Sequence, residues 1–292
     1  MSLGDRRGTM PKVKSALIVA NMLKSDASEL VTAIREYLEA QGIESQLLGF
    51  KGKPEVLEVE GEIDLALSLG GDGTVLFAAR LLASRQVPIL AVNIGDFGFI
   101  TEVSKHEWKT AFERYTSGQL GVSERLMLEV SVRRNGSVIG PYCALNDALI
   151  SAHNVSKVVR LDVSISDTEL GRYRADGVLI ASPTGSTAYS MAAGGPILSP
   201  EMDAMVLVPV SPFTLSNRPL VVPGHDTICI EVEEQKADVN LTLDGQVVCP
   251  LGVGDVVEVK QAKYRALIVR SDKRNFFDVL RAKLKWAGGP DA

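Results

Sequence analysis

One short stretch of the chain combines residue types that suit phosphate chemistry. Residues 67–76 read LSLGGDGTVL, in which an apolar run leads into glycines on both sides of Asp72. Glycines let a ligand approach the main chain closely, and the N–H groups at the start of a following helix favour an anion. We predict that Thr74 caps this helix and adds a hydroxyl to a phosphate site. The alternative is a tight strand-to-helix turn closed by a capping aspartate.

The position of Asp72 is the chemically informative part of this turn. A carboxylate among phosphate-binding glycines is unfavourable unless it accepts a proton from an attacking hydroxyl or engages Mg²⁺. The turn is not a Walker A loop, because no Gly-Lys-Ser/Thr follows it, and Leu76 stands where a dinucleotide fingerprint has its third glycine. Phosphoryl transfer is therefore the favoured chemistry.

A second candidate site is the hydroxyl-rich segment 182–190, which reads SPTGSTAYS. It follows the apolar run 178–181 and precedes the Gly194-Gly195 turn. Short donors and acceptors beside glycines suit sugar hydroxyls and a diphosphate. The alternative is a Ser/Thr-rich surface turn, although the apolar residues on both sides argue against full exposure.

The first half of the chain has the pattern of a doubly wound α/β domain. Buried strands are predicted at residues 14–20, 63–69 and 87–94. Residues 28–42 and 74–84 have helical spacing between them, and Gly42 stands where the first helix would stop. Short glycine-rich turns between such elements favour a parallel sheet.

The pattern changes after about residue 125. Alternating segments at 126–132, 158–165, 227–232 and 239–243, with a hairpin signal at Asn135-Gly136, predict a mostly antiparallel, sandwich-like β domain. Residues 275–286 have helical spacing and are expected to pack back on the first domain. We therefore predict an α/β domain at 12–125 with 271–286 returning to it, and a β-rich domain at 126–270.

Composition excludes several classes of protein. The 292 residues include 31 Lys and Arg against 36 Asp and Glu, a net charge of −5 that gives no footprint for nucleic acid. No apolar run has the length of a membrane span, and the polar start lacks the core of a signal peptide. The three cysteines have no metal-binding spacing, so we predict reduced thiols in a cytoplasmic protein and no metal held by side chains alone.

Family resemblance makes these predictions more specific. The GGDGT stretch resembles the signature shared by NAD kinases, diacylglycerol and sphingosine kinases and, more loosely, phosphofructokinases. Residues 182–198 (SPTGSTAYSMAAGGPIL) resemble the NAD kinase signature, which the other families lack. Five further stretches resemble that family in order along the chain: NIGDFGFIT at 93–101, ALNDALI at 144–150, PFTLSNRPLVVP at 212–223, LDG at 243–245 and FFDVLRAKLKW at 276–286.

The resemblance implies roles for individual residues. Asp72 is expected to engage the 2′-hydroxyl of the adenosine ribose of NAD and act as general base. Gly71 and Gly73 would line the triphosphate, and Gly73 would also contact NAD. Asn146 would bind the ribose or a phosphate through its amide. Asp147 stands where the family has Glu, which keeps the charge and shortens the reach by one methylene.

The remaining expected contacts with NAD come from three parts of the sequence. Phe99 would lie against the adenine, or else be a core residue. Asp176 would reach the nicotinamide end, and Arg174 would face a phosphate unless it is a solvated strand edge. The wall around NAD would consist of Thr184, Thr187, Ala188 and Tyr189.

The resemblance also implies ATP or polyphosphate as donor, Mg²⁺ as its charge partner, and a homodimer or homotetramer. Asp72 and the NAD wall come from different domains, so the active site is expected to draw on both. Two alternatives remain open from sequence. One is a lipid kinase with the same glycine turn, and the other is a non-catalytic NAD(P) sensor, which Asp147 and Ala192 (Ser in many relatives) would permit.

Overall fold

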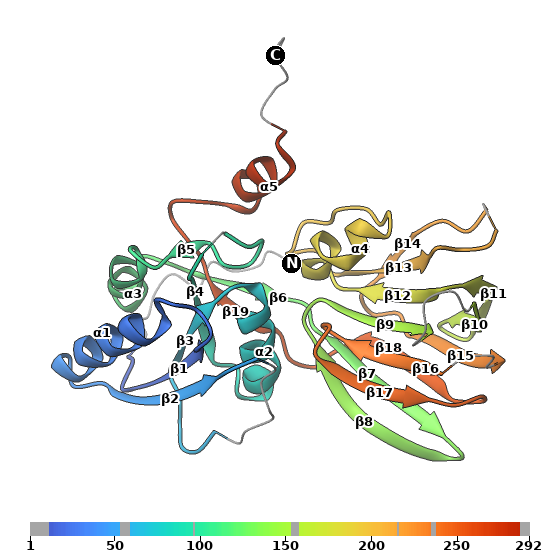
Figure 1. Cartoon of the computed structure of the whole chain (residues 1–292), viewed down its shortest axis with the longest axis horizontal. Coiled ribbons are helices and arrows are strands. Elements are labelled where there is room, and N and C mark those ends of the chain that lie inside the picture. The colour runs from blue at the N-terminus through green and yellow to red at the C-terminus, as the bar shows by residue number, and fades with distance from the viewer. Residues whose placement is uncertain are drawn as a thin grey trace, which may run out of the picture. The chain divides into compact units, whose positions relative to one another are not determined.

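The computed structural model describes residues 12–52, 59–95, 97–152, 158–214, 216–234 and 238–286. The chain divides into two compact units. The first is Met1–Glu124 with Ala266–Ala292, and the second is Arg125–Arg265. Figure 1 shows that strands are the main regular elements of the second unit, with few helical turns beside them.

The first unit is built on a sheet with the strand order β2-β1-β3-β4-β19-β6, and β5 pairs with β4. The pairs β1–β2, β1–β3, β3–β4, β4–β5 and β4–β19 are all parallel. The strands are β1 (Ser15–Asn21), β2 (Glu44–Phe50), β3 (Leu65–Gly70), β4 (Pro88–Asn93), β5 (Val103–Ser104), β6 (Val122–Arg125) and β19 (Ala266–Val269).

Helices cover both faces of this sheet, as Figure 1 shows. Apolar residues of α1 (Ala27–Ala40) and α3 (Trp108–Thr116) share one core with alternate residues of β1 and β3, such as Ile18 and Leu67. On the other side, α2 (Asp72–Leu82) contacts β1, β3, β4 and β19 and continues into the short helix η1 (Ala83–Arg85). Burial on both faces explains why β3 is buried at every residue.

The segment after β19 belongs to the same unit and ends in α5 (Phe276–Leu284). The Asn275 side chain accepts the N–H groups of Phe277 and Asp278, and the Asp278 side chain accepts the N–H of Asn275. This reciprocal capping box fixes the start of the helix. Val279 and Leu280 are its buried residues.

The second unit contains two six-stranded sheets in the orders β11-β10-β15-β18-β7-β8 and β14-β13-β12-β9-β16-β17. The recorded strand pairs are antiparallel. The strands are β7 (Leu128–Arg134), β8 (Ser137–Ala144), β9 (Asp147–Ala152), β10 (Val159–Ile165), β11 (Thr168–Ala175), β12 (Gly177–Ala181), β13 (Ala204–Val210), β14 (Leu220–Pro223), β15 (Ile228–Glu234), β16 (Val239–Leu243), β17 (Val247–Leu251) and β18 (Val256–Gln261).

One hydrophobic core takes alternate residues from both sheets, for example Val130 and Ile230 from one and Ile180 and Leu241 from the other. The outer face of β12 and β13 forms a second cluster with Leu198. The short helices η2 (Thr184–Thr187) and α4 (Tyr189–Ala192) lie in the segment between these two strands. Burial on both faces leaves β12 and β13 without alternation.

The predicted fold class is confirmed: an α/β unit is followed by a mostly antiparallel β unit and a C-terminal helix. The hairpin predicted at Asn135-Gly136 joins β7 to β8, and both residues have positive φ, as a two-residue hairpin turn requires.

Candidate active site

The glycine turn delivers Asp72 to the first position of α2, with Gly71 as the N-cap residue. The predicted cap at Thr74 is wrong, because the helix begins two residues earlier and no side chain caps it. Thr74 is buried and packs on Gly70, where an added Cβ would lie 2.1 Å from the Thr74 hydroxyl oxygen. Gly70 therefore allows the turn to close over Thr74.

The Asp72 carboxylate is held by the backbone of residues 99–101. Its Oδ2 accepts the N–H of Phe99 at 2.7 Å, and its Oδ1 accepts the N–H groups of Ile100 and Thr101, both at 3.1 Å. The Thr101 hydroxyl lies 3.2 Å from Oδ1. A carboxylate has about four acceptor positions. These donors therefore fix its orientation and leave Oδ2 able to accept from a substrate hydroxyl.

A second layer holds the loop in place. The Thr101 hydroxyl accepts the Asn93 amide at 2.7 Å and the N–H of Gly98 at 3.0 Å. An added Cβ at Gly98 would lie 1.9 Å from Asp72 Oδ1, so only glycine allows this approach. Sequence reasoning assigned no role to Asn93, Gly98 or Thr101, although all three lie in the NIGDFGFIT stretch. Phe99, half-buried, is not a core residue.

In the second unit, the hydroxyl-rich loop packs against the start of β9. The Ser182 N–H donates to the Asn146 carbonyl at 2.8 Å, and the Ser182 hydroxyl donates to the Leu145 carbonyl. An added Cβ at Gly185 would lie 2.0 Å from the Asn146 carbonyl oxygen, so the two backbones meet there. Asn146, predicted from a separate motif, thus lies against the turn that contains Thr184, and Asp147 pairs with Ala181 directly before that turn.

Three polar atoms in this part of the second unit are buried without a hydrogen-bond partner: Asn146 Oδ1, Thr184 Oγ1 and Ser190 Oγ. Burying such a group costs about 1–3 kcal/mol when no partner compensates it. A ligand rich in hydroxyls would provide those partners. The cluster therefore has the character of a binding site and not of a surface turn, since Thr184 and Thr187 are also buried.

Asp244 organises the backbone of this cluster, a role that sequence reasoning missed. Its carboxylate accepts the N–H groups of Leu145, Asn146 and Asp147 at 3.1, 2.7 and 3.2 Å. The Asp244 N–H donates in return to the Asp147 carbonyl at 2.9 Å. The Leu-Asp-Gly stretch around it was the only available signal, and it carried no assigned role.

Asp147 is buried beside this second carboxylate. Burial, followed by repulsion from Asp244, raises the pKa of Asp147 to about 7. The side chain therefore exchanges its proton near neutral pH, unlike an ordinary aspartate.

This shift gives a pH prediction. A carboxyl with a raised pKa binds its proton more tightly in the folded state, so stability is lost as pH rises from 3.8 to about 7. Asp147→Asn removes that loss. The gain in the free energy of unfolding over the parent is expected to be larger at about pH 8 than at about pH 5, by a few kcal/mol at most, and the gain in Tm should be larger accordingly. Thermal unfolding at both pH values measures it.

Asp176→Asn is the matched control, because Asp176 is exposed and adjoins the same strand pair. Its effect on Tm should not vary with pH in this range. An equal effect of Asp147→Asn at both pH values would contradict the burial of a titrating Asp147.

Arg174 and Asp176 lie away from the Asn146–Thr184 cluster. Asp147 pairs with Ala181 at one end of β12, whereas Asp176 precedes the other end and accepts the N–H of Ala152. Asp176 and Ala181, the strand partner of Asp147, are five residues apart along the chain. At 3.3 Å per residue this is about 16 Å. The exposed Arg174 guanidinium lies over the Phe213 ring at 4.4 Å. Within the expected wall, Ala188 is half-buried and Tyr189 is exposed.

The described ranges contain neither a cluster of potential metal ligands nor a membrane-spanning helix. No group of three or more His, Cys, Asp or Glu residues there is placed to hold a metal ion. None of the helices in those ranges has the length and apolar character that a membrane span requires.

Comparison with known proteins places the chain in a family. The ATP-NAD kinase N-terminal domain matches residues 53–120, and the ATP-NAD kinase C-terminal domain matches residues 145–271. The NAD kinase of Treponema denticola is 39% identical over 277 residues, which cover 94% of this chain and 98% of the relative. That of Geobacter sulfurreducens is 42% identical over 269 residues, which cover 89% and 93%.

Solved structures share the fold. Yeast NADH kinase complexed with NADH superposes with a TM-score of 0.85 at 24% identity, covering 95% of this chain and 89% of its own. The NAD kinase of Archaeoglobus fulgidus in complex with ATP has a TM-score of 0.75 at 24% identity, covering 94% and 99%. Fold, glycine turn and family matches together define a phosphotransferase. The chain belongs to the NAD kinase family.

Proposed function

We propose that this chain transfers the terminal phosphate of ATP to the 2′-hydroxyl of the adenosine ribose of NAD, giving NADP. The observation that carries the mechanism is the Asp72 carboxylate, fixed at the start of α2 by the backbone N–H groups of residues 99–101. The match to the ATP-NAD kinase family supports NAD as the acceptor and ATP as the donor.

In this mechanism Asp72 orients the hydroxyl and takes its proton. The ribose oxygen bonds to the γ-phosphorus as the bond from phosphorus to the bridging oxygen of ADP breaks, and ADP leaves with the electron pair. Aspartate is far more acidic than a sugar hydroxyl, so the proton moves late, as bonding to phosphorus develops. Orientation therefore contributes as much as basicity, and the fixed carboxylate suits that task.

Gly71 and Gly73 are proposed to face the triphosphate, together with the positive end of α2. Thr74 is proposed to support the turn, because its buried side chain is packed on Gly70. Since the described residues offer no three-ligand cluster, we propose that Mg²⁺ binds mainly through the ATP phosphates. There it would neutralise phosphate charge.

For NAD we propose that Asn146, Asp147 and Thr184 bind the ribose and phosphate part, because Asn146 Oδ1 and Thr184 Oγ1 lack partners and Gly185 packs against the Asn146 backbone. Asp176 and Arg174 would contact a distant part of the dinucleotide, as their separation along β12 requires. The further contacts proposed are Phe99, Gly73, Thr187, Ala188 and Tyr189.

Two broader properties are proposed from the family alone. They are a homodimer or homotetramer, and polyphosphate as an alternative donor. Size-exclusion chromatography with light scattering and a donor panel test them. A cytoplasmic location is proposed from the cysteines, which have no metal-binding spacing.

The substrate is tested with purified protein, ATP, Mg²⁺ and either NAD or diacylglycerol. A coupled dehydrogenase specific for NADP should report product from NAD. Phosphorylation of diacylglycerol alone would instead favour the lipid kinase alternative. NAD binding without any transfer would favour the sensor.

A further inference from the structure

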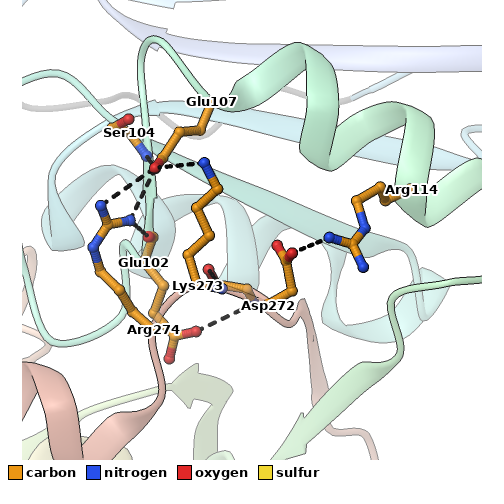
Figure 2. A network of polar contacts seen from close by, with 8 residues as sticks. Glu102, Ser104, Glu107, Arg114, Asp272, Lys273 and Arg274 are labelled. Atoms are coloured by element: carbon orange, nitrogen blue, oxygen red, sulfur yellow. Dashed lines mark hydrogen bonds and ion pairs between the residues drawn. The ribbon is translucent and has the colours of Figure 1, made fainter.

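The segment between β19 and α5 is fastened to the first unit by a network of charged side chains, which Figure 2 shows. Asp272 pairs with Arg114 of α3. The Ser271 N–H donates to the Glu102 carboxylate at 3.3 Å. Lys273 and Arg274 both approach Glu107, at 3.4 and 2.9 Å. The segment is therefore held at several points.

Arg274 differs from its neighbours because it contacts both ends of the stretch 97–102. Its guanidinium lies over the Phe97 ring at 4.4 Å and donates to the Glu102 carbonyl at 3.1 Å. The two nitrogens Nη1 and Nη2 also donate to the Glu107 carboxylate, at 2.9 and 3.3 Å. A planar fork that stacks and donates at once is a property of arginine that lysine lacks.

Glu107 keeps this guanidinium in place. Hydrogen bonds from Arg274, with a further one from the Ser104 N–H, lower the pKa of Glu107 to about 2. Both side chains are largely covered, with 30% of Arg274 and 19% of Glu107 exposed. The pair therefore stays charged throughout the range in which the protein would be assayed.

The residues between the two Arg274 contacts are those that hold Asp72. Phe99, Ile100 and Thr101 give their N–H groups to its carboxylate, and Gly98 lies against it. A displacement of Phe97 or Glu102 would move these donors, because Phe97 directly precedes Gly98 and Glu102 directly follows Thr101. Errors of about 1 Å in such positions cost up to about 100-fold in rate.

We propose that Arg274 is a positioning residue for phosphoryl transfer, which fixes the 97–102 stretch so that its N–H groups orient Asp72. This inference rests on the proposed role of Asp72. It assigns a function to the segment that joins the last strand to the last helix, a segment without residues in the proposed binding sites.

Steady-state kinetics tests the proposal with a matched control. Arg274→Ala should lower kcat by about 10- to 100-fold, because the orientation of Asp72 is lost. KM for ATP should change little, and KM for NAD should rise by less than kcat falls, through Phe99 alone. Asp272→Asn removes another ion pair of the same segment without touching residues 97–102, and should leave kcat unchanged. The kcat of Arg274→Lys should lie between those of Arg274→Ala and the parent, since lysine keeps the charge and lacks the planar guanidinium that stacks and donates at once.

A second readout does not depend on turnover. Amide hydrogen exchange at Phe99, Ile100 and Thr101, followed by NMR, should accelerate at least about tenfold in Arg274→Ala and Phe97→Leu, since local opening becomes easier. Asp272→Asn should exchange like the parent. If Arg274→Ala does not fold, Arg274→Lys and Phe97→Leu answer the same question.

Asp72→Asn, measured beside these variants, separates the two ideas. Normal turnover in Asp72→Asn would overturn the base role and with it the mechanism. A second outcome is that Asp72→Asn loses turnover while the Arg274 variants show the same kcat and the same amide exchange as Asp272→Asn. That outcome would overturn the positioning role of Arg274 and leave the base role of Asp72 intact.

Discussion

Asp72→Asn is expected to lower kcat by at least about 100-fold, the low end of what a positioned base contributes. The amide cannot take the hydroxyl proton. Its oxygen can still accept the N–H groups of Ile100 and Thr101, whereas its NH₂ group cannot accept from Phe99. We therefore expect a loss of stability of only about 1 kcal/mol and NAD binding that is largely kept. Kinetics, calorimetric titration with NAD and thermal unfolding measure the three effects.

Asp64→Asn is a suitable control for that variant. Asp64 also accepts backbone N–H groups, from Lys14 and Ser15 at 2.8 and 3.0 Å, and precedes β3. Its substitution removes a comparable backbone contact outside the site, so turnover should stay close to that of the parent. Near-normal turnover in Asp72→Asn would remove Asp72 from the base role.

Gly98→Ala should produce the second large effect. The new methyl group would lie 1.9 Å from Asp72 Oδ1, so either the carboxylate or the loop must move. Either movement breaks the set of N–H contacts that orients Asp72. We expect kcat to fall at least about tenfold, with a stability cost of about 1–3 kcal/mol.

Gly121→Ala provides the matched comparison, because a Cβ there meets no atom within 4 Å. Its kcat should equal that of the parent. In Asp72→Asn/Gly98→Ala the two losses should not add, since both act on one carboxylate. Full additivity would indicate that Gly98 acts independently of Asp72.

Elements with a strong periodic pattern were predicted close to their observed bounds. The run KSALIVA gave a strand that the structure places at Ser15–Asn21, and the spacing of Leu30, Ile34 and Leu38 gave a helix observed at Ala27–Ala40. These sequence patterns follow directly from burial, because each of these elements packs one or both of its faces against a large core.

Elements with weak burial were harder to predict. The edge strand β2 was missed, since of its seven residues only Leu48 is buried and no alternation results. The start of α2 was placed two residues late, because Thr74 is a good capping residue by type, while backbone closure over Gly70 decides the observed start.

The candidate site residues were suggested by motifs that are local in the sequence, GGDGT and SPTGSTAY. The contacts that organise them were not. Asp72 meets Phe99 across 27 residues, and Asp244 meets Asn146 across 98, so neither pairing leaves a periodic signal in the sequence. Only the folded structure reveals why two glycines are required: Gly98 lies against the Asp72 side chain, and Gly185 lies against the Asn146 backbone.

The most direct test of the central claim is the position of the transferred phosphate. Protein, NAD, ATP and Mg²⁺ are incubated, and the purified product is examined by ³¹P NMR with proton coupling. We predict a single phosphomonoester on the 2′-carbon of the adenosine ribose, absent from the Asp72→Asn reaction. A phosphate on any other hydroxyl, or no phosphorylated NAD from the parent protein, would contradict the account.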